Sequence, residues 1–454
     1  MAPNRDSRPH HLTKKSTKDK DHNTGAANNN NSNGATTHYN NHNSHSTATF
    51  PRAESASSNG TTAAPSYRTF ASTNPSSQDQ SPSQLFTQRH GRVYLKDQKQ
   101  PYPLPVDLDE LHRQSLRTLL LIQYFGSPVC CPSLKTNPPK RVLEIGCGPG
   151  FWSMMAHRYY KALGYGNIEF VGIDIAPLAL GSGKSGSGAF RPDKDMDWTF
   201  IRCDMMSQRW PFEDGEFDMV MNKDMTLAVS FPYQIHFITE ATRMLKSGGI
   251  IEMWETDHTI RMLRPHVPKA TEEHETAQRL GAYALDMGTP LSPPLNPYIV
   301  EFNRWVSQAL EARQLIANPC TTVTHNLYSQ TDTLTDVGFR RVAIPLNEIR
   351  WESDGVGGVV TKDGKSYVEM KERPPPQRVE KKTLTPGQEA LRRTALLTLV
   401  QEIQALELTL REVNGKSQDE WDVWLAKMTN DLMNEGGASW GECLESGVWW
   451  AKKL

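Results

Sequence analysis

Three glycines at alternate positions, with a carboxylate two residues before the first, have the spacing in this sequence that points most clearly to chemistry. They lie in the segment Arg141-Val-Leu-Glu-Ile-Gly-Cys-Gly-Pro-Gly150. Glycine lets the backbone turn sharply and approach a ligand where a side chain would clash. A carboxylate here would repel a pyrophosphate but attract a sulfonium and an amino group, by roughly a few kcal/mol at partly buried separations. Glu144 therefore favours S-adenosylmethionine over a nicotinamide dinucleotide at this loop.

Two further acids follow apolar segments downstream. Segment 168–174 ends in Asp174, 24 residues after Gly150, which is near the distance at which a βαβ unit delivers a carboxylate to ribose hydroxyls. Segment 198–204 ends in Asp204, which we expect to accept a hydrogen bond from an adenine amino group. Met205 or Met206 would then lie against the ring.

The apolar pattern predicts the elements that position these acids. Segments 142–145, 168–174, 198–204, 217–222 and 250–255 have the composition of strands buried in a parallel sheet. A helix over 232–245 ends at Lys246-Ser-Gly-Gly249, where a cation in the last turn and a glycine stop are typical of a helix end. Helical spacing also covers 301–315.

Taken together, four segments resemble the class I S-adenosylmethionine-dependent methyltransferases: 142–150, 171–174, 203–204 and 245–249. The resemblance covers about residues 139–260. It implies an α/β fold, a seven-stranded mostly parallel Rossmann-like sheet with helical additions, whose last two strands would be 338–346 and 348–351. It also implies S-adenosylmethionine as the cofactor, bound by residues Glu144, Gly146, Cys147, Gly148, Gly150, Asp174, Ile175, Asp204, Met205 and Asn222.

The lead-in before this region, residues 90–95 and 102–113, resembles the fungal LaeA-like, velvet-associated regulatory methyltransferases. In that group a similar lead-in forms a strand and a helix beside the cofactor. The glycine loop departs from the group, which usually has a threonine-rich loop, because Cys147 and Pro149 stand here, although Trp152 follows as in the group. A fungal small-molecule methyltransferase remains the alternative.

No catalytic residue is assigned from the sequence. The sulfonium is already an activated leaving group, so methyl transfer depends on alignment and desolvation, and a general base is optional. Asn222, Asp224 and His258 lie at or just after strand ends where the acceptor should sit, and they are candidates for substrate contact. Each is also a residue type that often has only a capping or structural role. No metal site is expected, because the pair Cys130-Cys131 has no matching pair elsewhere.

The chain divides by composition into four parts. Residues 1–88 are rich in Asn, Ser, Thr, His and Gly and are predicted to be a disordered tail. Residues 89–351 are the predicted methyltransferase domain, with a helical cap insertion at about 261–335, and 352–385 form a linker. Residues 386–454 are predicted to be a helical extension. Its leucine stripe and tryptophans would pack on its own domain or bind a protein partner in a hetero-oligomer.

Composition limits the function classes that remain. A formal net charge of −1 gives no strong nucleic-acid signal. Six irregularly spaced cysteines and the lack of an apolar span predict a cytoplasmic protein without a transmembrane segment, with a nuclear location as an alternative. Three hypotheses remain: a regulatory methyltransferase acting in a protein complex that affects gene expression or development, a methyltransferase for a small secondary metabolite, and a cofactor-binding scaffold with little turnover.

Overall fold

A computed structural model describes residues 85–97, 99–178, 193–354 and 381–454. The predicted disorder of the tail falls, up to residue 84, outside the described residues, and so does most of the predicted linker. Within the described ranges, no helix combines the length and apolar character that crossing a membrane requires.

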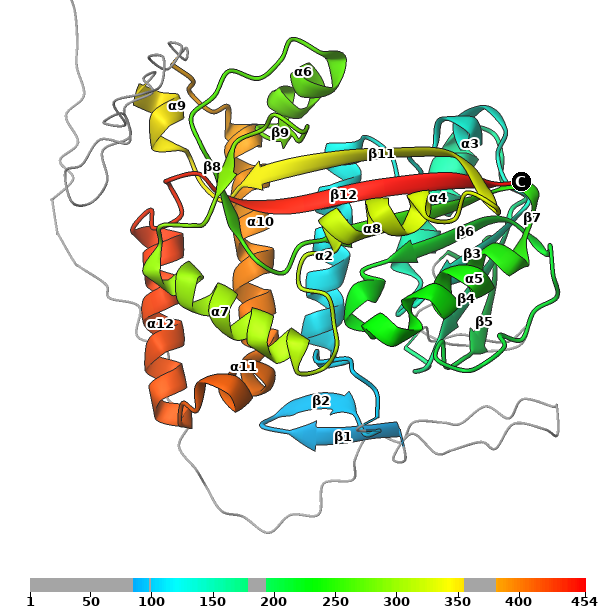
Figure 1. Ribbon diagram of the computed structural model, residues 1–454, viewed down its shortest axis with the longest axis horizontal. Coiled ribbons are helices and arrows are strands. Elements are labelled where there is room, and N and C mark those ends of the chain that lie inside the picture. The colour runs from blue at the N-terminus through cyan, green and yellow to red at the C-terminus, as the bar shows by residue number, and fades with distance from the viewer. Residues whose placement is uncertain (1–84, 98, 179–192, 355–380) are drawn as a thin grey trace, which may run out of the picture. The chain divides into compact units, whose positions relative to one another are not determined.

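The centre of the fold is a sheet of five parallel strands (Figure 1). Their order is β5-β4-β3-β6-β7, and each neighbouring pair is parallel. The strands are β3 (Arg141–Ile145), β4 (Glu169–Asp174), β5 (Asp197–Arg202), β6 (Phe217–Lys223) and β7 (Leu245–Thr256). All five correspond to predicted strands, and the predicted α/β fold with a mostly parallel central sheet is confirmed.

Helices between these strands explain why the central strands are apolar on both faces. α4 (Phe151–Ala162) follows β3, and α5 (Gln234–Met244) follows β6. Crossover helices of this kind cover both faces of a parallel sheet. Val142 accordingly belongs to one apolar core cluster and Leu143 to the other. The predicted helix 232–245 ends one residue early, because the chain enters β7 at Leu245 rather than after the glycines.

Two long antiparallel strands complete the sheet, and one of them lies where the sequence predicted a helix. β12 (Glu442–Lys453) pairs with β7 on one side and with β11 (Leu334–Pro345) on the other. β11 confirms the predicted strand 338–346. The predicted strand 348–351 is wrong, because α9 (Arg350–Asp354) begins there.

β12 also corrects the prediction that 386–454 is helical throughout. Its neighbouring tryptophans point to opposite faces of the sheet, as strand geometry requires. Trp449 is buried in one core cluster, whereas Trp450 packs against the other. Two adjacent large side chains can therefore both be covered, which a single apolar helix face would not achieve.

The insertion at 261–335 is mixed rather than purely helical. It contains β8 (Arg261–Leu263), α6 (Glu272–Arg279), β9 (Tyr283–Ala284), β10 (Leu291–Ser292), α7 (Pro297–Glu311) and α8 (Pro319–Tyr328). β8 pairs with β12 and β10, and β9 pairs with β11. The insertion thus extends the antiparallel end of the sheet.

The C-terminal helices pack on their own domain. They are α10 (Pro386–Ala405), α11 (Glu407–Asn414) and α12 (Gln418–Asn434). α10 lies beside α2 (Leu108–Phe125), which Figure 1 shows as neighbouring orange and cyan helices. Leu399 and Ile403 of α10 share a core cluster with Leu120 and Leu121 of α2. The predicted leucine stripe is therefore buried within the chain.

The lead-in forms a hairpin and a helix. β1 (Phe86–Arg89) pairs with β2 (Arg92–Leu95), and α3 (Pro132–Thr136) follows α2. Asp107 caps α2 by accepting from the Glu110 backbone N–H, and both of its oxygens also accept from the Arg92 guanidinium, at 2.6 and 2.8 Å. This bidentate pair fixes the hairpin to the start of α2.

Candidate functional site

The glycine loop after β3 has a backbone that only glycine adopts readily. Gly146, Gly148 and Gly150 have φ of +63°, +50° and +74°, in the left-handed region that other residues enter at a cost of about 1–2 kcal/mol. Gly150 caps the start of α4. A Cβ built on Gly148 would meet no protein atom within 4 Å. The loop therefore leaves open space beside Gly148 for a ligand.

Glu144, at the end of β3, is a buried carboxylate held by neutral donors. It is 4% exposed, and its Oε2 accepts from the Ser153 backbone N–H at 3.2 Å and from the Ser153 hydroxyl at 2.6 Å. No basic side chain lies within ion-pair distance among the described residues. Burial raises the pKa of Glu144 to about 7. A cationic ligand beside it would restore the ionised form.

Asp174 joins the end of β4 to the glycine loop. Its two oxygens accept from the backbone N–H groups of Gly148 and Ala176, at 2.9 and 3.0 Å. Burial raises the pKa of Asp174, and these two donors oppose the rise. Each oxygen keeps a second lone pair, so the carboxylate can still accept from a ligand hydroxyl.

Asp204 lies two residues beyond β5 and is exposed. Its oxygens accept from the Met206 backbone N–H at 2.9 Å and from Gln100 Nε2 at 3.3 Å. Like Glu144 and Asp174, it has no basic partner within ion-pair distance in the described part of the chain. The three carboxylates give this part of the site a negative charge.

One cavity brings most of the predicted residues together at the carboxyl edge of the parallel sheet. Those that line it are Glu144, Gly146, Cys147, Gly148, Asp174, Ile175, Asp204, Met205, Met206, Asp224 and His258. Two predicted residues do not line it. Gly150 acts as a helix cap, and Asn222 lies fully buried in the sheet, with its amide lacking a hydrogen-bond partner among the described residues.

The loop after β6 forms one wall of this cavity. Asp224 has a left-handed φ of +55°, and its backbone N–H donates to the Trp254 carbonyl at 2.9 Å. Burial opposes ionisation of Asp224, but an ion pair with Lys223 holds its pKa below the usual value. Glu255 fixes the following turn by accepting from the backbone N–H groups of Met225 and Thr226, at 2.9 and 3.3 Å.

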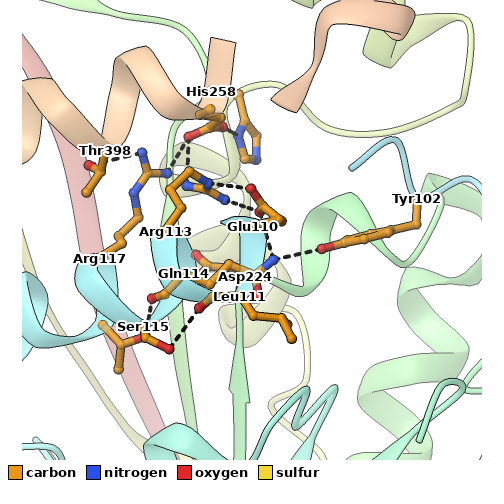
Figure 2. Close-up of polar contacts among 12 residues, drawn as sticks. Tyr102, Glu110, Leu111, Arg113, Gln114, Ser115, Arg117, Asp224, His258 and Thr398 are labelled. Atoms are coloured by element: carbon orange, nitrogen blue, oxygen red, sulfur yellow. Dashed lines mark hydrogen bonds and ion pairs between the residues drawn. The ribbon is translucent and has the colours of Figure 1, made fainter. Parts of the chain in front are cut away.

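Another part of the cavity lining is a buried charge cluster (Figure 2). His258 Nδ1 lies 2.9 Å from Glu402 Oε1, and Arg117 Nη1 lies 2.5 Å from Glu402 Oε2. Arg113 pairs with Glu110 through two hydrogen bonds of 2.8 and 2.6 Å and reaches Glu402 at 3.4 Å. Burial opposes ionisation of Glu402, but the arginines and His258 hold its pKa well below the usual value.

Two further polar residues beside this cluster, Tyr102 and Gln114, line the cavity. Gln114 Nε2 donates to the Tyr102 hydroxyl at 2.9 Å and to Glu110 Oε1 at 2.9 Å (Figure 2). Burial raises the pKa of Tyr102, so its hydroxyl keeps its proton. α2, α10 and the loops after β6 and β7 thus enclose one half of the cavity, and the glycine loop with Asp174 and Asp204 forms the other.

Comparisons with known proteins agree with this geometry. Residues 142–249, from the first parallel strand to the glycines within β7, match the family described as "Methyltransferase domain". The chain carries a class I S-adenosylmethionine-dependent methyltransferase domain. This confirms the resemblance drawn from the glycine loop and the acids that follow it.

Curated relatives match parts of the chain. A "Secondary metabolism regulator laeA" of Coprinopsis cinerea is 27% identical over 180 residues, which are 38% of this chain and 40% of the relative. A protein of the same name from Aspergillus niger is 29% identical over 120 residues, 25% of this chain and 29% of the relative. A "Malonyl-[acyl-carrier protein] O-methyltransferase" of Legionella pneumophila is 35% identical over 82 residues, 18% of this chain and 25% of the relative. The chain thus spans less than half the length of each.

The residues of the methyltransferase domain suit its cofactor. S-adenosylmethionine carries a sulfonium, an ammonium group, ribose hydroxyls and an adenine amino group. Glu144, Asp174 and Asp204 offer acceptors without competing cations, and the loop at Gly148 leaves room for close approach. When bound, the cofactor supplies an electrophilic methyl group, and these residues would hold and orient it.

Sequence reasoning missed the residues that complete the far half of the cavity. Glu402, Arg113, Arg117, Gln114 and Tyr102 line it, and none was predicted as a site residue. One signal was present for Glu402. It lies three residues after Leu399 and four before Leu406, so helical spacing places this acid on the apolar face, where an unpaired charge is unfavourable.

The insertion at 261–335 does not have the predicted place over the site. Within the described residues, its side chains do not line the cavity. Its helices lie against the C-terminal extension instead, as where Trp424 of α12 donates to Glu301 of α7 at 2.8 Å. α2 and α10 supply lining residues of the cavity instead.

One buried group outside the cavity has residue types that bind metals. Ligand atoms of Asp257, Cys320 and Glu445 lie within 4.8 Å of one another. Glu445 already pairs with both Arg261 and Arg341. Two guanidinium groups provide positive charge here, so this group is an ion-pair cluster within the sheet.

Proposed function

We propose that this protein is an S-adenosylmethionine-dependent methyltransferase that regulates secondary metabolism. The observation that carries the enzymatic part is the set of three carboxylates, Glu144, Asp174 and Asp204, around a glycine loop with open space at Gly148. A negatively charged cleft favours a cationic nucleoside over an anionic dinucleotide.

The residues predicted from the sequence, together with Lys223, receive roles in this proposal. Glu144 faces the positive charges of the cofactor, Asp174 accepts from the ribose hydroxyls, and Asp204 with Met205 holds the adenine. Lys223, Asp224 and His258, at the ends of β6 and β7, adjoin the methyl acceptor. Cys147 and Ile175 line the same cavity and shape its apolar surface.

The regulatory part rests on the names of two relatives, each called a secondary metabolism regulator. We propose that the protein acts in the cytoplasm and nucleus, within a protein complex that affects gene expression or development. The buried leucine stripe of α10 is not available for such a partner, because it packs on the domain itself. A partner would need another surface.

A metabolite acceptor is the second candidate. The groups around the far half of the cavity, Arg113, Arg117, Glu402 and His258, are all buried. A folded protein surface cannot enter such a space, whereas a small molecule or one extended side chain can. The relative that modifies a malonyl carrier protein acts, by its name, on a small group carried by a protein.

Calorimetry on the purified chain tests the cofactor. We expect binding of S-adenosylmethionine and no binding of NAD, and saturable NAD binding with no response to S-adenosylmethionine would overturn the proposal. Formation of S-adenosylhomocysteine is then followed after adding a cell extract separated into protein and small-molecule fractions. Turnover with the protein fraction supports a protein acceptor, turnover with the other supports a metabolite, and binding without turnover identifies a scaffold.

A further inference from the structure

His258 is a buried side chain with only half of its hydrogen-bonding capacity used. It is 5% exposed and lines the cavity. Its Nδ1 lies 2.9 Å from Glu402, and its Nε2 has no hydrogen-bond partner among the described residues. A buried polar atom without a partner costs about 1–3 kcal/mol. The ring lines the cavity, and this buried nitrogen could accept a hydrogen bond from a ligand that packs against the ring.

The partner of Nδ1 determines which nitrogen carries the proton. Glu402 is held ionised by Arg117 and Arg113, so both of its oxygens only accept hydrogen bonds. Nδ1 must then carry a proton, which it donates to Glu402 Oε1. In the neutral ring the lone pair then lies on Nε2, the nitrogen that has no hydrogen-bond partner among the described residues.

The position of His258 relates it to the reacting centre. It follows the end of β7, which is parallel to β6, and the backbone bond from Asp224 to Trp254 joins the two strand ends. Lys223, Asp224 and the glycine loop line the same cavity at this edge of the sheet. A group at the carboxyl ends of central parallel strands faces the ligand crevice of such folds.

We propose that His258 is the catalytic base that removes a proton from the methyl acceptor, and that Glu402 is the positioning residue that fixes its ring. This inference rests on the proposed methyl transfer and adds the base and the class of acceptor. His258 is contributed by the methyltransferase domain, whereas Glu402 comes from the C-terminal helix α10.

The proposed step moves a methyl group from sulfur to the acceptor and a proton from the acceptor to His258. An acceptor oxygen or nitrogen uses a lone pair to form a bond to the cofactor methyl carbon, and the bond from that carbon to sulfur breaks with its electron pair remaining on sulfur. The acceptor proton moves to His258 Nε2. The resulting imidazolium keeps its Nδ1–H bond to the Glu402 carboxylate, which stabilises the new charge, and the ring later returns the proton to water.

The charges around His258 narrow the acceptor further. Arg113 pairs with Glu110, Arg117 with Glu402, and Lys223 with Asp224. These cations are already neutralised, so they leave no surplus positive charge for a carboxylate or phosphate. The acceptor that fits is uncharged and has an O–H or N–H to lose, such as an alcohol, a phenol or an amide-type nitrogen.

The protonation of the His258 ring can be tested without measuring turnover. Protein labelled with 15N at histidine is examined by NMR at pH 7.5, with His258→Asn used to assign the signal. We expect a neutral ring with a protonated Nδ1 and an unprotonated Nε2. A ring protonated at Nε2, whether neutral or cationic, would remove the lone pair and overturn the proposal.

Turnover supplies the second test. His258→Asn should bind S-adenosylmethionine in calorimetry like the parent, within about twofold, yet lose roughly 100-fold or more in S-adenosylhomocysteine formation, the usual contribution of a general base. His112→Asn, the same change at an exposed position of α2, should be unaffected in both measurements.

The outcomes separate this inference from the function on which it rests. If the parent protein forms no product with either fraction, methyl transfer itself fails, and the base fails with it. If the parent turns over and His258→Asn retains its rate, methyl transfer stands and the base is wrong. Turnover with a carboxylate acceptor would likewise overturn the assigned acceptor class, because a carboxylate has no proton to lose.

Discussion

The two halves of the cavity carry charge in different ways. In the cofactor half, Glu144, Asp174 and Asp204 are held by neutral backbone, hydroxyl and amide donors. The other half, formed by α2, α10 and the loops after β6 and β7, is the one proposed to hold the acceptor and is called the acceptor half. Its lining carboxylates each have a cation beside them, as Glu402 has Arg117 and Asp224 has Lys223. The carboxylates of the cofactor half therefore remain available to a cationic ligand, whereas those of the acceptor half are already neutralised by cations of the protein.

The halves also differ in how the chain assembles them. The cofactor half comes from three consecutive strand ends, β3, β4 and β5. The acceptor half joins α2, the ends of β6 and β7, and α10, so that Arg117 and Glu402 are 285 residues apart in sequence. Local sequence motifs can thus specify the proposed cofactor site, whereas the proposed acceptor site depends on contacts between segments that are far apart in the sequence.

Removal of the central acid of the acceptor half should have the largest effect. Glu402→Leu leaves Arg117 buried without its carboxylate and frees His258, so we expect the free energy of unfolding to fall by about 3–5 kcal/mol. Chemical denaturation measures this. Gln404→Leu, at an exposed position on the same helix, is the control. A neutral result for Glu402→Leu would mean that charge pairing does not hold this half together.

In the cofactor half, a single added methyl group should weaken cofactor binding strongly while it costs the fold only a modest amount of stability. Gly148→Ala places a Cβ where no protein atom lies within 4 Å, but where we expect the cofactor. Affinity for S-adenosylmethionine should fall about 100-fold, or about 3 kcal/mol, in calorimetry.

Gly415→Ala provides the matched control for backbone strain. Gly415 also has a positive φ, +71°, and open space, but it ends α11 away from the cavity. Both variants should lose about 1–2 kcal/mol of stability, and only Gly148→Ala should lose affinity. Equal affinities in the two variants would place the cofactor elsewhere.

Asp174→Ala should have an intermediate effect. It removes the acceptor assigned to the ribose and the anchor of the Gly148 N–H, so binding should weaken by about 1–3 kcal/mol. Calorimetry gives the affinity, and thermal unfolding reports any loosening of the loop. Unchanged affinity with an intact fold would show that the ribose role is wrong.

The pH dependence of binding should show the smallest effect, about tenfold per pH unit. Because the pKa of Glu144 is about 7 in the free protein, the group holds a proton below pH 7 that a cationic ligand must displace. Affinity should be constant above pH 7 and should fall as the pH drops below it. Glu144→Gln should bind more weakly and show no such slope, and a slope that persists would implicate another group.

The raised pKa of Glu144 also predicts a pH dependence of stability, opposite in direction to that of cofactor affinity. A rise from 4.5 to about 7 means that ionised Glu144 costs the cofactor-free fold up to about 3 kcal/mol above pH 7, and that this cost disappears as pH falls toward 4.5. Glu144→Gln should therefore stabilise the free protein at pH 8 while it weakens cofactor binding. A loss of stability in that variant would contradict the burial argument.

Sequence reasoning succeeded where function depends on local patterns. The glycine loop, the five parallel strands and the acids at their ends follow from apolar runs and fixed spacings, so β3 to β7 and the three carboxylates could be placed in advance. His258 could be named as a candidate because it follows a predicted strand. Its hydrogen bond to Glu402 could not be predicted, because no local pattern joins residues that far apart.

The incorrect sequence predictions for the last strand and for Asn222 have related physical causes. The last strand was misplaced because β12 follows three helices, and its tryptophans resemble a continuation of their apolar faces until the alternation of Trp449 and Trp450 is considered. Asn222 was assigned to the site because the predicted strand 217–222 ends there. β6 runs one residue further, and strand alternation leaves Asn222 buried on a face of the sheet while Lys223 lines the cavity.

The central position of β12 has a consequence for biosynthesis. β12 lies between β7 and β11, and Thr256 meets Ser446 across 190 residues of chain. On the ribosome, the free edge of β7 stays without its neighbour until β12 has emerged, and an unpaired strand edge invites aggregation. Folding that depends on such a distant pairing is slow, so the nascent chain should require chaperone protection from the emergence of β7 until that of β12.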